Sequence, residues 1–204
     1  MNSQDITQLV IATRNEGKLR EFKSLLAGTG WRILGLREIG AGVDPEEAGT
    51  TFEENARQKA VACSRVIEDP VLADDSGLEV FALGGRPGIL SARHAGENAT
   101  DAQRIQKLLR ELDQTRGERG ARFVCALALA RQGRPILEVQ GECRGVIAHK
   151  PRGDRGFGYD PVFFFPQLGR TYAELGEEEK NAYSHRGRAV RLLLARLEER
   201  SELG

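Results

Sequence analysis

The chain gathers polar residues where predicted strands end and predicted helices begin, which is where a fold can hold a charged ligand. The segment Thr13–Lys18 (TRNEGK) follows a short apolar run and opens a helical pattern. Backbone N–H groups at a helix start, joined by a hydroxyl, an amide and a lysine, suit a phosphate group. The GxxxxGK(S/T) pattern of a P-loop is absent, and an ordinary strand–helix turn with a surface lysine is the alternative.

Adjacent carboxylates form a second cluster. Asp74 and Asp75 end a short apolar run. Burying two negative charges costs free energy unless a cation lies beside them, and either Mg²⁺ or a lysine would fill that role. An acidic turn with Gly77 at positive φ is the alternative. Glu46 and Glu47 lie in a loop rich in Gly, Glu and Pro, and taken alone they are typical of solvated charge.

Two further clusters lie in the last third of the chain. In Gly156–Asp160 (GFGYD), glycines between aromatic rings suit a flat group such as a nucleobase, and a packed glycine-rich turn is the alternative. Lys180 and Ser184 lie four residues apart in a helical pattern, so we expect them to share a helix face, with His185 and Arg186 directly after them. No HxxxH, HExxH or GxSxG pattern supports a histidine–zinc site or covalent catalysis.

Alternating strand and helix signals must position these clusters. Strands are expected at residues 8–13, 31–36, 71–73, 78–83, 121–131, 136–147 and 162–165. Helices are expected from about residue 16 to Gly28, from Thr51 to residue 67, from Thr100 to residue 112 and over residues 177–199. Thr51 and Glu54 predict a capping box, and residues 132–135 predict a hairpin loop. The mixture predicts an α/β class with a mixed sheet.

The composition is that of a globular protein. The 204 residues are 40% apolar and 29% charged, and 30 basic residues balance 30 acidic ones. This length fits one domain, or one domain with two lobes, and zero net charge gives no support for nucleic-acid or membrane binding. The longest apolar run is too short for a membrane helix. Three widely spaced cysteines form neither a disulfide framework nor a metal motif, which favours buried thiols and a cytoplasmic location.

Taken in this order, the motifs resemble the inosine/xanthosine triphosphate pyrophosphatases. The resemblance covers nearly the whole chain. The matching segments are residues 13–18, 46–60, 72–80, 83–97, 155–163 and 173–189.

The resemblance implies a two-lobed α/β domain spanning residues 1–204, with an elongated central mixed sheet and an active-site cleft between the lobes. It also implies a homodimer that uses one or more Mg²⁺ ions per subunit. The implied reaction is hydrolysis of ITP, dITP and XTP to the monophosphate and pyrophosphate, which removes deaminated purines from the nucleotide pool.

Site residues follow from the resemblance by position. Asp75 would be the general base and a metal ligand, Glu47 a second metal ligand, and Asp74 a less certain third. Residues that would contact the substrate are Thr13, Arg14, Asn15, Glu16, Gly17, Lys18, Lys59, Ser76, Phe157, Gly158, Tyr159, Asp160, Lys180, His185 and Arg186. The sequence departs from the pattern at Arg14, where smaller residues are frequent, and at His94, where an aromatic residue is usual.

The residue types fit this chemistry independently. Phosphoryl-centre hydrolysis depends mostly on positioning and charge neutralisation. Mg²⁺ prefers oxygen ligands such as Glu47 and Asp75, and Lys18 and Lys59 would offset the remaining phosphate charge. Two alternatives stay open: a related pyrophosphatase for modified pyrimidine or other noncanonical nucleotides, and a nucleotide-binding regulator that has lost catalysis.

Overall fold

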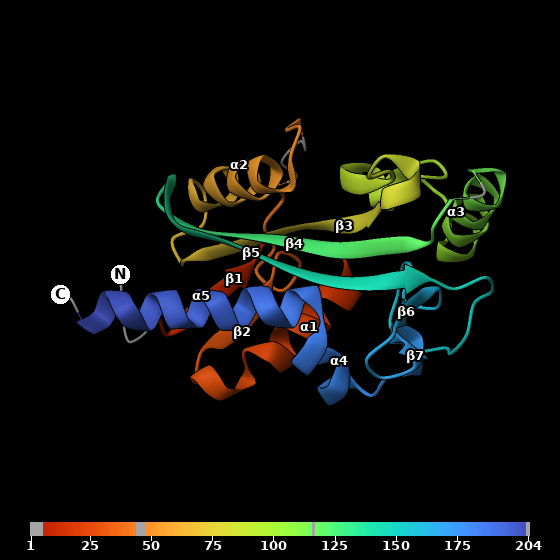
Figure 1. The fold of residues 1–204 in the computed structure, drawn as a ribbon. Helices are drawn as coiled ribbons and strands as arrows, with labels where there is room; N and C mark the ends of the chain where they lie inside the picture. The colour runs from red at the N-terminus through yellow and green to blue at the C-terminus, as the bar shows by residue number, and fades with distance from the viewer. Residues whose placement is uncertain (1–5, 44–47, 116, 203–204) are drawn as a thin grey trace. The chain divides into compact units, whose positions relative to one another are not determined.

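The computed structural model describes residues 6–43, 48–115 and 117–202, and it contains one mixed β-sheet (Figure 1). The strands are β1 (Gln8–Ile11), β2 (Arg32–Gly35), β3 (Val71–Val80), β4 (Gly120–Arg131), β5 (Arg134–Ile147), β6 (Phe163–Phe165) and β7 (Arg170–Thr171). Their order in the sheet is β2-β1-β3-β4-β5-β6-β7. β1 pairs in parallel with β2 and β3, whereas β6 pairs antiparallel with β5 and β7. The α/β class and the mixed sheet are therefore confirmed.

The helices are α1 (Glu16–Leu25), α2 (Phe52–Ser64), α3 (Asp101–Thr115), α4 (Glu177–Tyr183) and α5 (His185–Glu202). The chain divides into two compact units. The first contains residues 1–75, 125–141 and 186–204, and the second contains residues 76–124 and 142–185. The expectation of a single domain with two lobes stays a prediction.

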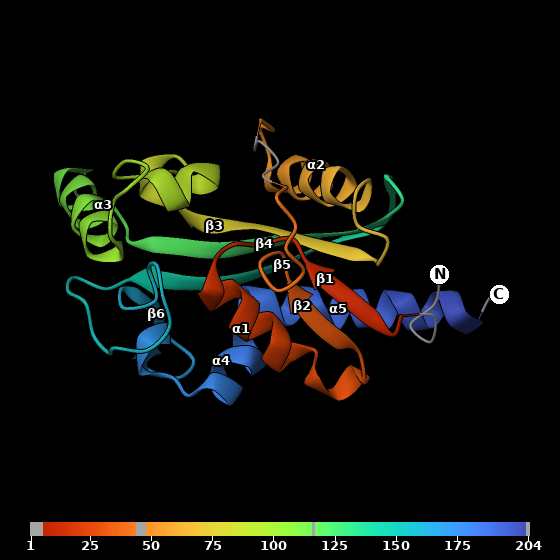
Figure 2. The ribbon, with the colours of Figure 1, turned by 180° about the vertical axis from the view of Figure 1, so that it is seen from behind.

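In the first unit, helices cover both faces of the sheet. α2 lies on one face, and α1 and α5 lie on the other (Figures 1 and 2). The α5 stripe of Val190, Leu193 and Leu197 packs with Phe22 of α1 and Leu72 of β3 in one buried cluster. The 3.6-residue period places the α5 residues on one helix face, which is why that face and not its charged neighbours enters the core.

The second unit has its own apolar core. Ile105, Leu108 and Leu112 of α3 share a buried cluster with Leu78 of β3 and Phe163 of β6. Thr100 caps α3, because its hydroxyl accepts a hydrogen bond from the backbone N–H of Gln103 at 3.2 Å. This cap confirms the predicted start of the helix.

The strand around the paired carboxylates differs from the expectation. Two short strands separated by an acidic turn at Gly77 were expected, but β3 runs unbroken from Val71 to Val80. Gly77 does not adopt a positive φ. Residues 81–83, expected to end a strand, form a 3-10 helix. Asp74 and Asp75 remain in extended backbone because cationic and amide groups stabilise their buried carboxylates, as described below.

The predicted long C-terminal helix is also wrong in one respect. Ser184 has extended backbone dihedrals (φ −67°, ψ 159°) and separates α4 from α5. The expectation that Lys180 and Ser184 share a helix face fails for this reason, although the Ser184 N–H donates to the Lys180 carbonyl at 2.8 Å. The break places His185 and Arg186 in the first turn of a new helix.

Two turns refine the remaining predictions. Only Gln132 and Gly133 join β4 to β5, and both have positive φ, as a tight hairpin turn requires. The Thr51 hydroxyl caps α2 by accepting from the Glu54 N–H at 3.1 Å. The Glu54 carboxylate, however, accepts from the N–H of Thr50 at 2.8 Å, one residue earlier than a capping box would have it.

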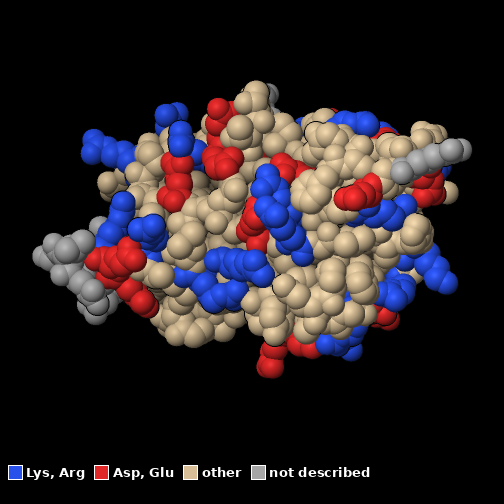
Figure 3. Space-filling view, in the orientation of Figure 1, with Lys and Arg blue, Asp and Glu red and all other residues tan. Residues whose placement is uncertain are grey.

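The distribution of charged side chains at the surface agrees with the zero net charge of the sequence. On the face seen in Figure 3, basic and acidic side chains are interspersed among uncharged residues. Within the described ranges, no helix is long and apolar enough to cross a membrane. Cys63, Cys125 and Cys143 are buried and belong to no disulfide, as predicted.

Candidate active site

Asp74 and Asp75 face different neighbours, because successive side chains of a strand point to opposite faces of a sheet. Asp74 meets groups from α1 and α5, and Asp75 meets α2. Figures 1 and 2 show these helices on opposite faces. The alternation gives two adjacent and chemically identical residues two different surroundings.

Asp74 is the centre of a buried ionic cluster. Its Oδ2 lies 3.2 Å from Lys18 Nζ and 3.2 Å from Arg186 Nε, and the Cys125 thiol lies 3.6 Å from its Oδ1. Burial raises the pKa of the Asp74 carboxyl, but the charges of Lys18, Arg186 and Lys59 outweigh burial and hold that pKa well below its usual range. Asp74 is therefore ionised and already bound to cations.

Arg186 ties this cluster to α1. Its side chain is buried, and Nη1 donates to Glu21 Oε2 while Nε donates to Asp74. Burial lowers the pKa of the guanidinium, whereas Asp74 and Glu21 raise it further, so the net shift is upward. Burial raises the pKa of the neighbouring Cys125 thiol, and the Asp74 charge raises it further. The thiol is therefore a protonated donor and not a nucleophile.

The predicted phosphate segment opens α1. Asn15 is the N-cap, since its side-chain oxygen accepts from the N–H groups of Gly17 at 2.8 Å and Lys18 at 3.1 Å. The Thr13 hydroxyl accepts from the Asn15 N–H at 3.1 Å, and Glu16 pairs with Arg37 at 2.9 Å. These bonds fix the turn that presents Lys18. Arg14, the departure from the family pattern, donates weakly to the Val43 carbonyl at 3.4 Å.

Two residues of α2 reach the β3 carboxylates. Lys59 Nζ lies 3.4 Å from the backbone carbonyl oxygen of Asp74. Asn55 Nδ2 donates to Asp75 Oδ2 at 2.9 Å. Asn55 and Lys59 are four residues apart and so share one face of the helix. The first unit thus places Lys18 beside the Asp74 carboxylate, and it places Lys59 and Asn55 beside Asp74 and Asp75 from the α2 side.

The carboxylates differ in how well they fit a metal. Within the described residues, no group of three or more His, Cys, Asp or Glu side chains could hold an ion. Glu46 and Glu47, including the predicted ligand Glu47, lie outside those residues. Asp74 is bound to Lys18 and Arg186, which disfavours it as a ligand. Asp75 fits Mg²⁺, which commonly takes one or two protein carboxylates together with substrate phosphates and water.

The second unit holds the aromatic turn predicted to bind a base. Lys180 pairs with Asp160, and its Nζ lies 5.1 Å from the centre of the Phe157 ring. Asp160 Oδ2 also accepts from the Phe157 N–H at 2.9 Å, and Asp101 Oδ2 accepts from the Gly158 N–H at 2.7 Å. The N–H groups of Phe157 and Gly158 therefore have carboxylate acceptors within the unit.

Packing explains the glycine and the aromatic residues of this turn. A Cβ on Gly156, whose φ is +74°, would come 2.0 Å from Asp160 Oδ2, so no larger residue fits. The Tyr159 hydroxyl donates to the Ser91 carbonyl at 3.1 Å. His185 stacks on Phe123 with ring centres 4.6 Å apart. Ser76, the remaining predicted contact, follows Asp75 on β3 and is partly exposed.

Sequence reasoning missed four contributors: Glu21, Asn55, Asp101 and Cys125. Helical spacing was the available signal for two of them. Glu21 lies three residues after Lys18, and Asn55 lies four residues before Lys59, so each shares a face with a predicted site lysine. No local spacing connects Asp101 or Cys125 to the site, since both meet their partners through tertiary packing.

Fold and site together define an α/β protein with a carboxylate–lysine centre suited to an anionic, phosphate-bearing ligand. The chain belongs to the Ham1 family, whose model matches residues 9–196.

Two curated relatives carry the same activity name. The dITP/XTP pyrophosphatase of Geobacillus kaustophilus is 54% identical over 193 residues, covering 94% of this chain and 95% of the relative. That of Bacillus subtilis is 47% identical over 192 residues, covering 94% and 97%.

Solved structures agree in fold. A HAM1 protein from Coxiella burnetii has a TM-score of 0.85 at 44% identity, covering 95% of this chain and 100% of the other. The Staphylococcus aureus Ham1 protein has a TM-score of 0.82 at 44% identity, covering 95% and 99%. These likenesses extend over nearly the full length of each protein.

Proposed function

We propose that the protein hydrolyses dITP, ITP and XTP to the nucleoside monophosphate and pyrophosphate in a Mg²⁺-dependent reaction. The observation that carries the proposal is that two successive residues of β3 collect these groups: Lys18 lies beside the Asp74 carboxylate, Lys59 lies beside the Asp74 carbonyl oxygen, and the Asp75 carboxylate accepts from Asn55. Two relatives named dITP/XTP pyrophosphatase, which are 54% and 47% identical to this chain, support the proposal.

Each group has a role in this reaction. Lys18 and Lys59 neutralise phosphate charge and hold the triphosphate, with the Thr13–Lys18 turn beside it. Asp75 accepts a proton from the attacking water. Asp75 and Glu47 would hold Mg²⁺, which supplies further neutralisation of the phosphate oxygens when bound. Water attacks directly, because the one thiol of the cluster, Cys125, is held protonated.

Asp74 has a different role in this proposal. Its bonds to Lys18 and Arg186 hold these side chains in place, so it acts as an anchor and not as a metal ligand. Ser76 follows Asp75 on β3 and is assigned a substrate contact next to the reacting phosphate.

We assign recognition of the base to residues of the second unit: Phe157, Gly158, Tyr159, Asp160, Lys180 and His185. Hypoxanthine and xanthine present the acceptor O6 where adenine presents an amino donor, and Lys180 has only donors. Because the N–H groups of Phe157 and Gly158 already donate to carboxylates, Lys180 and His185 are the favoured readers of O6. The Phe157 ring supplies a flat surface.

Arg186 was also expected to contact the substrate, and its guanidinium could donate to O6 of the base. Its bonds to Asp74 and Glu21 favour the alternative, in which it supports the phosphate side of the site. Arg186→Ala should then lower kcat/KM by a similar factor for ITP, XTP, GTP and ATP. A selective loss for ITP and XTP would restore the base-reading role.

A substrate panel tests the proposal. Pyrophosphate release should be fast with dITP, ITP and XTP and slow with GTP, ATP and dTTP. Adenine would leave a buried donor unpaired, which costs about 1–3 kcal/mol per group. Preference for a modified pyrimidine would favour the related pyrophosphatase, and tight ITP binding without turnover would favour the regulator.

Metal dependence, assembly and location need separate measurements. Dialysis against EDTA should abolish turnover, and Mg²⁺ alone should restore it without Zn²⁺. Full activity in EDTA would refute the metal requirement. We also propose a cytoplasmic homodimer, as the family resemblance implies, and sedimentation equilibrium of the purified protein tests the dimer.

A further inference from the structure

Asn55 forms hydrogen bonds through both the nitrogen and the oxygen of its side-chain amide inside the site. It lies in the first half of α2 and is 2% exposed. Its Nδ2 donates to Asp75 Oδ2 at 2.9 Å, and its Oδ1 accepts from the Gly49 N–H at 2.8 Å. One buried side chain therefore joins a carboxylate of β3 to the segment that enters α2.

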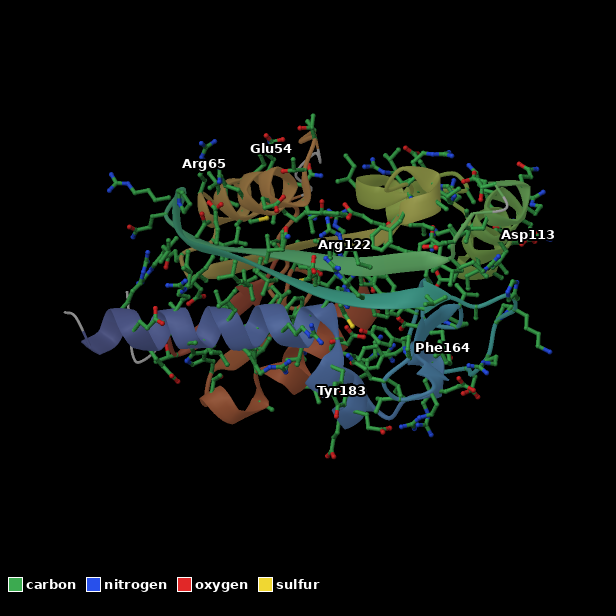
Figure 4. The ribbon with its side chains drawn as sticks, viewed as in Figure 1. Glu54, Arg65, Asp113, Arg122, Phe164 and Tyr183 are labelled. Carbon is green, nitrogen blue, oxygen red and sulfur yellow. The ribbon has the colours of Figure 1, made fainter. Side chains whose placement is uncertain are left out.

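That entering segment is packed tightly on the helix. A Cβ on Gly49 would lie 2.7 Å from Asn55 Oδ1 and 2.8 Å from Glu54 Cβ, which leaves room for glycine alone. Both the N–H and the hydroxyl of Thr50 donate to Glu54 Oε2, at 2.8 and 2.9 Å. Figure 4 labels Glu54 near this end of α2 and Arg65 at the opposite end. Gly49 thus stands at a fixed position next to Asn55.

We propose that Asn55 is a positioning residue for the reaction: it sets the orientation of the Asp75 carboxylate and fixes the position of that carboxylate relative to Gly49. The proposal rests on the role assigned to Asp75 under the proposed function. The terminal torsion of an aspartate is broad and roughly two-fold, so a buried donor on one oxygen decides how the carboxylate plane is turned. Asn55 itself needs no contact with the substrate.

The chemistry of this position explains why an amide is required. Asn carries a donor and an acceptor at the same branch point, whereas Asp carries acceptors only when ionised. Asn55→Asp keeps an acceptor for the Gly49 N–H but places a second negative charge about 3 Å from Asp75, where like charges disfavour each other. Asn55→Ala removes both bonds, including the one that turns the Asp75 carboxylate.

Turnover of the folded protein is the first test. We expect kcat for dITP to fall about 100-fold in both variants, the order of loss that a displacement of about 1 Å can cause, with KM little changed. Gln58→Glu is the matched control, because it makes the same amide-to-acid change at an exposed position of α2. It should retain wild-type kcat. If the role of Asn55 is merely structural, its variants will be less stable but will keep the wild-type kcat per folded molecule. That result would overturn the proposal.

A metal-free unfolding cycle is the second test. In EDTA, Asn55→Asp and Asp75→Asn should each lower Tm. The double variant restores an amide–carboxylate pair in reversed order, so it should recover Tm without recovering turnover. Failure to recover Tm would show that the pair does not interact as described. Absence of turnover in the wild-type protein would refute the proposed function and the catalytic part of this inference, whereas the unfolding cycle would still decide the pairing.

Discussion

Replacing Asp74 by asparagine should destabilise the protein strongly, although the two side chains have nearly the same shape. The ion pairs of the buried cluster join two cations, Lys18 and Arg186, to two anions, Asp74 and Glu21. Asp74→Asn leaves one positive charge in excess. Arg186 is 3% exposed at its side chain, so water cannot compensate for the missing carboxylate.

The size of the effect follows from this burial. Removing one partner of a buried ion pair costs about 3–5 kcal/mol. For a protein of about 150–250 residues, each kcal/mol corresponds to about 2–4 °C in Tm, so we expect Tm to fall by about 6–20 °C. Urea unfolding at pH 8 in EDTA, followed by circular dichroism, measures the free energy of unfolding directly.

A second substitution tests the charge argument. Adding Lys18→Met to Asp74→Asn restores neutrality, and the double variant should be more stable than Asp74→Asn alone. The control Glu38→Gln breaks the exposed Lys23–Glu38 pair and should leave Tm nearly unchanged. A loss below about 1 kcal/mol in Asp74→Asn, on the scale of an exposed pair, would refute the buried-cluster reasoning, as would a double variant no more stable than the single one.

Further predictions concern turnover and pH. Asp75→Asn should still fold, although with a lower Tm, and should lower kcat by about 10²–10⁴-fold, the usual contribution of a general base; near-normal kcat would exclude that role. Lys18→Ala and Lys59→Ala should reduce kcat/KM for ITP and ATP by the same factor, because a point charge on phosphate cannot read the base, and a changed ITP/ATP ratio would contradict this. Burial lowers the pKa of His94 despite neighbouring Glu111. The unfolded state therefore takes up its proton first, and stability falls as pH drops below about 6.5. His94→Gln should flatten the decline in Tm between pH 7.5 and 5.5, and an unchanged slope would contradict the assignment.

Local patterns determined much of the scaffold. The apolar stripe of α5, the Thr100 cap of α3 and the β4–β5 hairpin all depend on residues close in sequence, and the structure confirms each, with a hairpin loop shorter than the one predicted. The ordered motifs also indicated the family, since they extend over most of the chain. The end of α4 at Ser184 could not be predicted in this way, because the helical period continues through the break.

The sequence by itself determined that two carboxylates at residues 74 and 75 need a cation. The residue types alone could not divide their roles, because the two are identical neighbours and an acidic turn remained an alternative; only the family resemblance assigned the general base to Asp75. Tertiary structure decided the matter by placing both in one buried strand, where alternation turns Asp74 toward Lys18 and Arg186 and Asp75 toward Asn55. Lys18 and Arg186, which lie more than one hundred positions apart in the chain, thereby neutralise Asp74. Asp75, which accepts from the neutral amide of Asn55 on its α2 side, keeps a carboxylate suited to a metal and a proton.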